Sequence, residues 1–303
     1  MKTARSIIVG IDYSANSKNA LAEAARIAHW NDGKLLCLHV FDEEIFDAFR
    51  AGEGFDEEGV KKAAQEALEK YVADAIGSGH QVDCQIKVGH PFRELVVAVE
   101  ARAADLLVLG SRGLDVDAAN RTGALASRCV RKAPVDVLLV RERQIEPFRN
   151  IVACTDFSEN SIRAAHLAAE IARQDSAALE LLHIYRSPVY NAPDVGIFGP
   201  VLPPVFSAEV IKVLQERLDA LADEISSAHD GLEIRATVEE WSGIPAGINR
   251  RLGEVEADLA VLGTRGRTGI KGMLIGTTAE KIIHHSPCST LAVKPEGFEY
   301  SIG

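Results

Sequence analysis

Short apolar segments alternate with stretches of helical periodicity along the whole chain. In the first half, the apolar segments predict strands near residues 6–11, 35–41, 82–88, 105–110 and 136–141, and the stretches between them predict helices near 17–30, 59–77, 91–103 and 123–132. The runs IIVGI, LLVLG and VLLV are apolar at every position rather than at alternate ones. Such strands are expected to be buried on both faces, as in a parallel sheet covered by helices.

Signals at the helix starts agree with this pattern. We expect Ser17 and Ser161 to be helix N-caps, because a serine side chain accepts a hydrogen bond from the first turn. Pro91 and Pro245 fit the first turns of the helices that follow them. Strands that alternate with helices through right-handed crossovers predict a doubly wound α/β fold.

The chain is two copies of one unit. Residues 6–21, SIIVGIDYSANSKNAL, resemble residues 150–165, NIVACTDFSENSIRAA, at an offset of 144, which grows to 153 after the second strand. A repeat of this length indicates a duplicated domain, because solenoid units repeat every 20–50 residues. We therefore predict two tandem doubly wound domains, residues 1–142 and 148–303, joined by the polar segment 141–149. Each is expected to hold a five-stranded parallel sheet of order 3-2-1-4-5 with helices on both faces.

Composition narrows the classes of function. The 303 residues include 33 Lys and Arg against 44 Asp and Glu, a net charge of −11, whereas a nucleic-acid-binding surface is basic. The number of cysteines is odd and none forms a C-x-x-C pair, which is typical of a reducing compartment. We interpret all five as small core hydrophobes: Cys37, Cys84, Cys129, Cys154 and Cys288. Signal-peptide and membrane-spanning patterns are missing. We expect a cytoplasmic protein with neither a nucleic-acid nor a membrane partner.

The most unusual segment follows the fourth strand of the second copy. In a sheet of this order, ligands bind beyond the carboxyl ends of the strands, where the strand order reverses. Residues 263–278 read GTRGRTGIKGMLIGTT there. The glycines let backbone amides face a ligand, and the helix that opens at the end of the segment adds unpaired amides, its dipole and two hydroxyls. Three cations lie within it: Arg265, Arg267 and Lys271. These features predict a polyphosphate site.

A family resemblance supports this interpretation. The loop at residues 263–277 resembles the G-2x-G-9x-G-(S/T) nucleotide loop of the universal stress protein family. The D-x-S-x-x-S motifs at residues 12–17 and 156–161, and the G-x-P motifs at 89–91 and 243–245, are also similar to that family's. The resemblance covers nearly the whole chain twice and implies a tandem member.

The resemblance implies particular site residues. In the ATP-binding branch of that family, the aspartate after the first strand and the backbone at the end of the second strand face the adenosine. By position these are Asp156 and Ile184. The phosphates would then be held by Gly263, Thr264, Arg265, Gly266, Arg267, Gly276, Thr277 and Thr278. The implied cofactor is ATP with Mg²⁺.

The first copy departs from this pattern. Its loop, residues 110–124, keeps the glycine spacing, but Ala124 replaces the hydroxyl residue. Between the second and third glycines, Asp115, Asp117 and Arg121 give a net charge of −1, against +2 in the second copy. One unit-charge contact at ~4 Å is worth roughly 4 kcal/mol before desolvation and screening, well above the about 1 kcal/mol of a lost hydroxyl hydrogen bond. We predict ATP binding in the second copy, and a weak or degenerate site at Asp12, Val40, Gly110, Arg112, Gly113 and Gly123.

Some residues have a structural interpretation as well. Asp12 and Asp156 fit helix caps as well as ligand contacts, and His39 and His183 are expected to be core histidines with satisfied hydrogen bonds. We predict no metal site at residues 284–288, HHSPC, because adjacent helical residues point to different faces.

Two further segments differ between the copies. Residues 42–58 carry eight acids and are interpreted as a solvated face. The proline-rich residues 188–204 predict either a long ordered loop or a mobile flap over a ligand cleft.

Catalytic signatures are missing from the sequence. It contains neither a Walker loop nor a G-x-S-x-G elbow, and no G-x-G-x-x-G follows either first strand. We therefore predict a stress-response regulatory protein that binds an adenine nucleotide, with at most slow ATP hydrolysis or autophosphorylation near Thr277 or Thr278. Two alternatives stay open: a nucleotide-hydrolysing or adenylating enzyme on the same scaffold, and a module whose first copy binds a non-nucleotide ligand or a partner protein.

The last strands, VDVLLVR and CSTLAVK, are apolar and lie at the sheet margins. Exposed strand edges favour pairing. We expect the two copies to pair through these strands as an intramolecular pseudo-dimer, with a homodimer as a further option.

Overall fold

The structure is a computed structural model that describes residues 4–52, 55–77, 81–113, 122–142, 146–186, 204–266 and 274–300, with only the backbone for residues 204–207. Two compact units make up the chain. The first unit comprises Met1–Glu146 and Glu296–Gly303, and the second comprises Pro147–Pro295. None of the described helices combines the length and the apolar character needed to cross a membrane.

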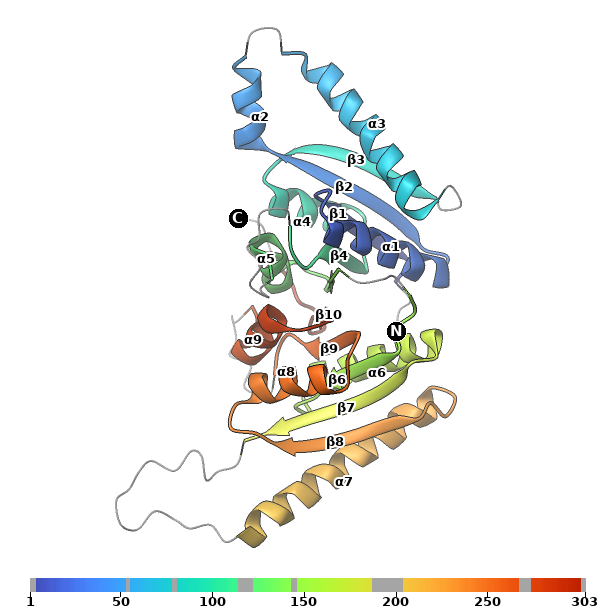
Figure 1. Cartoon of the computed structure of the whole chain (residues 1–303), viewed down its shortest axis with the longest axis vertical. Coiled ribbons are helices and arrows are strands. Elements are labelled where there is room, and N and C mark those ends of the chain that lie inside the picture. Colours follow the sequence, from blue (N-terminus) through green and yellow to red (C-terminus); the bar gives the residue numbers. More distant parts are fainter. Residues whose placement is uncertain are drawn as a thin grey trace, which may run out of the picture. The chain divides into compact units, whose positions relative to one another are not determined.

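The first unit is a doubly wound parallel sheet. Its elements are β1 (Ser6–Ile11), α1 (Ala15–Trp30), β2 (Lys34–Asp42), α2 (Glu43–Arg50), α3 (Glu57–Ile76), β3 (Val82–Gly89), α4 (Pro91–Ala101), β4 (Leu106–Gly110), α5 (Ala124–Lys132) and β5 (Asp136–Val140). The strand order is β3-β2-β1-β4-β5, and all described pairings are parallel. Helix α1 packs with α3 and α4 packs with α5, so the helices form two layers (Figure 1).

The second unit repeats this architecture. Its elements are β6 (Asn150–Cys154), α6 (Glu159–Asp175), β7 (Ala178–Tyr185), α7 (Pro204–Ala228), β8 (Ile234–Glu240), α8 (Ile244–Glu254), β9 (Leu259–Gly263), α9 (Thr277–His285) and β10 (Ser289–Val293). The order β8-β7-β6-β9-β10 repeats that of the first unit, with α6 against α7 and α8 against α9 (Figure 1). The predicted fold, two five-stranded sheets of order 3-2-1-4-5 with helices on both faces, is confirmed.

The central strands are buried on both faces. Ile7, Ile8 and Val9 on β1 are consecutive and at most 1% exposed, and Val261 on β9 is fully buried. Burying such a side chain stabilises a fold by about 1.5–3 kcal/mol. This burial explains why the strands are apolar at every position.

The helix starts differ from the prediction. Ser14 is the N-cap of α1 and accepts a hydrogen bond from the Ser17 N–H at 3.1 Å, and Ser158 caps α6 through the Ser161 N–H at 3.3 Å. The prediction of Ser17 and Ser161 as caps is therefore wrong. Both serines lie within the first turn of their helices. The Ser17 hydroxyl donates a hydrogen bond to the Ser14 carbonyl. The prolines predicted in the first turns of α4 and α8 are confirmed.

Helix α2 was not predicted from the sequence. It lies in the acidic segment after β2, and its N-cap is Asp42, whose side chain accepts a hydrogen bond from the Glu44 N–H. Phe46 is buried, with its ring centroid 5.7 Å from that of Phe41 and 5.5 Å from that of Phe55. The interpretation of this segment as a solvated face thus missed a helix that one aromatic side chain anchors.

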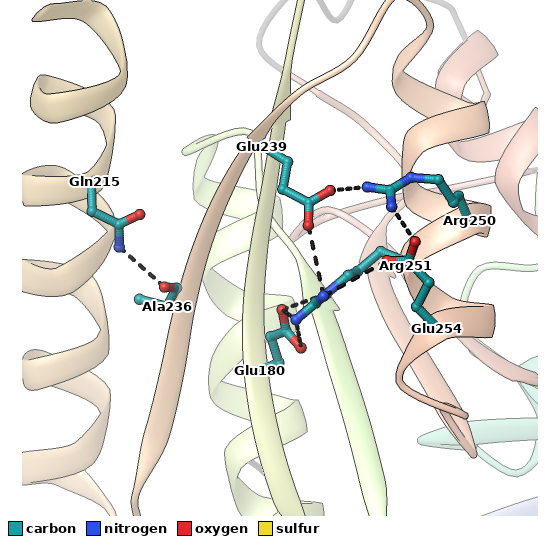
Figure 2. A network of polar contacts seen from close by, with 7 residues as sticks. All are labelled: Glu180, Gln215, Ala236, Glu239, Arg250, Arg251 and Glu254. Carbon is teal, nitrogen blue, oxygen red and sulfur yellow. Dashed lines mark hydrogen bonds and ion pairs between the residues drawn. The ribbon is translucent and has the colours of Figure 1, made fainter. Parts of the chain in front are cut away.

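Helix α8 is held against the sheet of the second unit by a charged network (Figure 2). The Arg251 guanidinium donates hydrogen bonds of 3.0 and 3.2 Å to the carboxylate of Glu180 on β7. Glu239 on β8 accepts from Arg250, which also pairs with Glu254. At the position of Glu180 in the first unit stands Leu36, whose side chain is buried. The second unit thus has a paired carboxylate where the first unit has an apolar side chain.

Candidate functional site

A cavity of about 850 Å³ lies at the carboxyl ends of β6, β7 and β9 in the second unit. Eight of the ten residues predicted to bind nucleotide line it: Asp156, Ile184, Gly263, Arg265, Gly266, Gly276, Thr277 and Thr278. The loop after the first strand, the end of the second strand and the glycine loop are thus brought together. Ligand pockets in proteins measure ~300–1,000 Å³, so the cavity has a suitable size for a small molecule.

A second cavity, of about 970 Å³, lies at the other end of the same sheet, around the starts of β6 and β7. It is the larger of the two, but none of the predicted site residues lines it. Parallel sheets of this topology bind ligands at the carboxyl ends of their strands. The 850 Å³ cavity is therefore the candidate site.

The N-terminus of α9 forms one wall of the candidate site. Gly276 is its N-cap, and no side chain caps the helix. Thr277 and Thr278, the first two helical residues, line the cavity. The first amides of a helix have no partner within it and carry the positive end of the helix dipole, which favours anions. With Arg265 in the same wall, this part of the cavity suits phosphate groups.

Asp156 faces the glycine loop. Phe157 adopts a left-handed conformation, with φ of 63°, and turns the chain so that one carboxylate oxygen of Asp156 accepts the Ser158 N–H at 3.0 Å. The other oxygen lies against Gly266: a Cβ atom built there would be 2.5 Å from it. Since Ser158 caps α6, Asp156 is not the N-cap, and its carboxylate is placed at the cavity instead.

Ile184 and Gly263 lie at the ends of their strands. The pairing of β7 with β6 ends at Leu182, two residues before Ile184. Gly263 ends β9 in close contact with Asn160 of α6: an added Cβ atom would be 2.8 Å from the amide nitrogen of Asn160. A glycine is needed there because the helix and the strand approach too closely for a side chain.

Thr264 does not line the cavity. Its side chain is fully buried, and both its N–H and its hydroxyl donate to the Val293 carbonyl, at 2.8 and 3.2 Å. Its own carbonyl accepts the Gly276 N–H at 2.8 Å, so Thr264 positions the start of α9. Arg267 lies outside the described residues, as do Lys271 and the segment 187–203 that holds most of the predicted flap.

The histidines at the ends of the second strands are hydrogen-bonded within the fold, and His183 also lines the cavity. The Nδ1 atom of His183 donates to the Thr155 carbonyl at 2.7 Å, and that of His39 donates to the Ile11 carbonyl at the same distance. The His183 ring packs on Phe157, with 4.7 Å between the centroids. This agrees with the expectation of core histidines.

The apolar wall of the cavity was not predicted from the sequence. It is formed by Tyr185, Ile244, Ile248, Leu262 and Ile282. The Tyr185 hydroxyl donates to Glu240 at 2.9 Å, and burial together with this hydrogen bond raises the pKa of Tyr185 to about 12. The phenol is thus neutral at physiological pH. The spacing of two isoleucines four residues apart at the start of α8 was the available signal.

The first unit has the same framework at its weak candidate site. An added Cβ atom at Gly113 would be 2.9 Å from an Asp12 carboxylate oxygen, and the Arg112 carbonyl lies 3.4 Å from the Ser14 hydroxyl. Gly123 is the N-cap of α5, while Gly110 ends β4 against α1. Val40 is half-buried on β2.

The two units differ in the groups around this framework. Helix α5 begins with Ala124 and Leu125, where α9 begins with two threonines. After β2 the chain enters α2, which has Glu43 and Glu44 in its first turn. After β7 the chain continues with Arg186, which lines the cavity. Residues 114–121, which hold the loop's charges in the first unit, lie outside the described part of the chain.

Comparisons with known proteins agree with the duplication. The family model described as the universal stress protein family matches residues 3–141 and 147–294. A universal stress protein of Mycolicibacterium smegmatis is 25% identical over 302 residues, which cover 95% of this chain and 97% of that protein. A putative universal stress protein of Staphylococcus saprophyticus is 28% identical over 163 residues, 52% of this chain and 96% of its own length. Among solved structures, a universal stress protein from Archaeoglobus fulgidus has a TM-score of 0.66 at 18% identity, covering 98% of this chain and 99% of its own.

Proposed function

Because the chain belongs to the universal stress protein family, as a tandem member, we propose that it is a stress-response regulatory protein that binds ATP in its second unit. The observation that carries the proposal is the single cavity that joins Asp156, the apolar wall and the N-terminus of α9. An adenine nucleotide needs these three environments: an apolar slot for the base, a polar group for the ribose and an anion site for the phosphates.

We propose a contact for each part of the ligand among the described residues. The adenine ring would contact Ile184 and the isoleucines of the wall, and the ribose hydroxyls would donate to Asp156. The phosphates would lie at the first turn of α9, near Thr277 and Thr278. Mg²⁺ prefers oxygen ligands and usually keeps several waters when it binds through substrate phosphates. The hydroxyls of Thr277 and Thr278 are oxygen donors near the proposed phosphate position, and Mg²⁺ would neutralise phosphate charge there.

The first unit is proposed to bind ATP weakly or not at all. Its loop has a net charge of −1 between the second and third glycines, against +2 in the second unit. The acidic first turn of α2, Glu43 and Glu44, follows β2 directly and repels phosphate at that end of the sheet. Three further predictions from the sequence remain predictions: a cytoplasmic location, pairing of the two copies through their last strands, and a homodimer.

Titration of the whole chain with ATP and Mg²⁺ is expected to give one bound nucleotide per chain, measured by calorimetry. Ala124→Thr in the first unit restores the missing hydroxyl and is expected to leave this number at one, because charge outweighs a single hydrogen bond of about 1 kcal/mol. Thr277→Val in the second unit removes the equivalent hydroxyl and is expected to weaken binding about fivefold. Two equal sites in the unchanged chain, or none, would contradict the proposal.

We propose that bound ATP is hydrolysed slowly or not at all. Phosphoryl-transfer sites hold Mg²⁺ with several protein groups and orient the nucleophile with a further residue. Among the described residues that line the cavity, Asp156 is the only carboxylate, and it already accepts the Ser158 N–H. Release of ADP is therefore expected to be far slower than an ordinary enzyme's ~10 per second. A coupled assay that finds such turnover in the unchanged chain, and loses it in Asp156→Asn, would assign the site to an enzyme.

A further inference from the structure

Two cysteines that are far apart in the sequence meet in the sheet of the first unit. Cys37 on β2 and Cys84 on β3 are register partners in the parallel pair. Register partners project from the same face of a sheet at the same level. The two side chains are therefore neighbours on one face of the sheet. Helix α3 covers this region, since its Gln65 side-chain amide donates to the Cys84 carbonyl at 2.8 Å.

The two thiols have different environments. Cys37 is buried, whereas Cys84 is half-buried on the terminal strand of the sheet. The neighbouring Cys37 thiol lowers the pKa of the Cys84 thiol, although burial and the acids Glu69 and Asp83 oppose this effect. The neighbouring Cys84 thiol, together with burial, raises the pKa of Cys37. Cys84 is thus the thiol that reaches the thiolate form more easily and that solvent can reach.

We propose that Cys37 and Cys84 are a dithiol that peroxides oxidise reversibly to a cross-strand disulfide. In the first step the Cys84 thiolate attacks hydrogen peroxide, the O–O bond breaks, and Cys84 becomes a sulfenic acid while one water is released. In the second step the Cys37 sulfur attacks the Cys84 sulfur, the S–O bond breaks, and a second water leaves with the Cys37 proton. Two thiols thereby lose two electrons, and the peroxide is reduced to two waters.

The geometry of the strands permits this bond. Neighbouring strands lie about 4.7–4.9 Å apart, within the ~4.4–6.8 Å that disulfides span between Cα atoms. A disulfide needs the Cβ atoms within ~3.5–4.5 Å of each other, and a small movement of one strand can bring them to that separation. Strand β3 is free to make it because it is the terminal strand and β2 is its one strand neighbour among the described residues. Thiol–disulfide exchange with an added thiol breaks the bond again, which makes the step reversible.

Among the described residues, the second unit has no cysteine pair at the equivalent register position. The equivalent register pair on β7 and β8 is Leu181 and Ala236. The cysteines of the second unit are buried, and burial raises the pKa of Cys154 to about 12, so it is almost entirely a thiol at neutral pH. Oxidation is therefore expected to act on the first unit and to spare the nucleotide cavity.

Peptide mapping of the full chain tests the proposal. The protein is treated with equimolar hydrogen peroxide, alkylated with N-ethylmaleimide in denaturant and digested with trypsin. We expect the loss of two of the five thiols and a disulfide between the tryptic peptides 35–50 and 71–87, which dithiothreitol reverses. Retention of all five thiols, or a cross-link that joins two chains on a non-reducing gel, would overturn the proposal.

Two variants separate the roles of the cysteines. Cys84→Ala, which places there the residue that the second unit has, is expected to keep its four thiols under the same treatment. Cys37→Ala is expected to lose one thiol, recovered as a dimedone adduct of Cys84. A Cys84→Ala protein that loses two thiols as fast as the unchanged chain would refute the assignment. The peptide map of the unchanged chain needs no variant, so the proposal stays testable where a variant unfolds.

Discussion

Gly266→Ala is expected to weaken ATP binding by roughly 10- to 100-fold while the second unit stays folded. A Cβ atom at this position would lie 2.5 Å from a carboxylate oxygen of Asp156, so the carboxylate has to rotate away. The carboxylate can move because it is the end of a flexible side chain. The backbone tolerates the alanine because Gly266 has no positive φ. The displaced carboxylate loses a charge-assisted hydrogen bond to the ribose, which is worth about 1.5–3 kcal/mol. Calorimetric titration with ATP measures the change.

Gly113→Ala is the matched control for this prediction. The equivalent methyl group would lie 2.9 Å from a carboxylate oxygen of Asp12 in the first unit. Because ATP is proposed to bind in the second unit, this variant is expected to keep the affinity of the unchanged chain. If Gly113→Ala weakens binding and Gly266→Ala does not, the nucleotide site lies in the first unit.

Arg251→Met is expected to destabilise the second unit by about 3–5 kcal/mol, because it leaves a carboxylate buried without its partner. The side chain of Glu180 is 8% exposed and that of Arg251 is 18% exposed, so solvent compensates little. Replacing both residues, Glu180→Leu with Arg251→Met, is expected to recover most of the loss, because hydrophobic packing replaces buried ion pairs well. The first unit already has a buried leucine, Leu36, at the position of Glu180.

Urea denaturation followed by tryptophan fluorescence checks this prediction. Trp241 is in the second unit, and Trp30→Phe removes the other tryptophan, so the signal reports on the second unit alone. Lys212→Met is the control: it breaks the pair with Glu216 on α7, whose side chains are 76% and 66% exposed. Exposed pairs of this kind contribute about 0–1 kcal/mol. Equal effects of Arg251→Met and Lys212→Met would show that the buried pair contributes no more than a surface pair.

The candidate site could be located from the sequence because its parts follow strands that are easy to recognise. Loops after β6 and β9 lie at the same edge of a parallel sheet whatever the side chains are, so Asp156 and Gly266 were expected together. The role of Thr264 could not be predicted in this way. It depends on the neighbouring strand β10, whose Val293 carbonyl accepts from both its N–H and its hydroxyl.

The apolar wall was missed for a similar reason. Ile248 on α8 and Ile282 on α9 look like ordinary core residues in the sequence, since each belongs to an amphipathic helix. Packing of α8 beside α9 brings them to one cavity. Helix α2 was not predicted because its segment is rich in acidic residues and Phe46 is its one buried side chain.

The sequence by itself determined the fold, the duplication and the position of the glycine loop. These follow from local periodicity and from the offset between the copies, which is 144 residues up to the second strand and 153 after it; neither needs knowledge of distant contacts. The tertiary structure alone decided the serine caps, the ion pair of Glu180 with Arg251 and the meeting of Cys37 with Cys84. These depend on the exact start of a helix or on the register of strands that are distant in the chain. A shift of one residue in that register would turn the partners to opposite faces of the sheet.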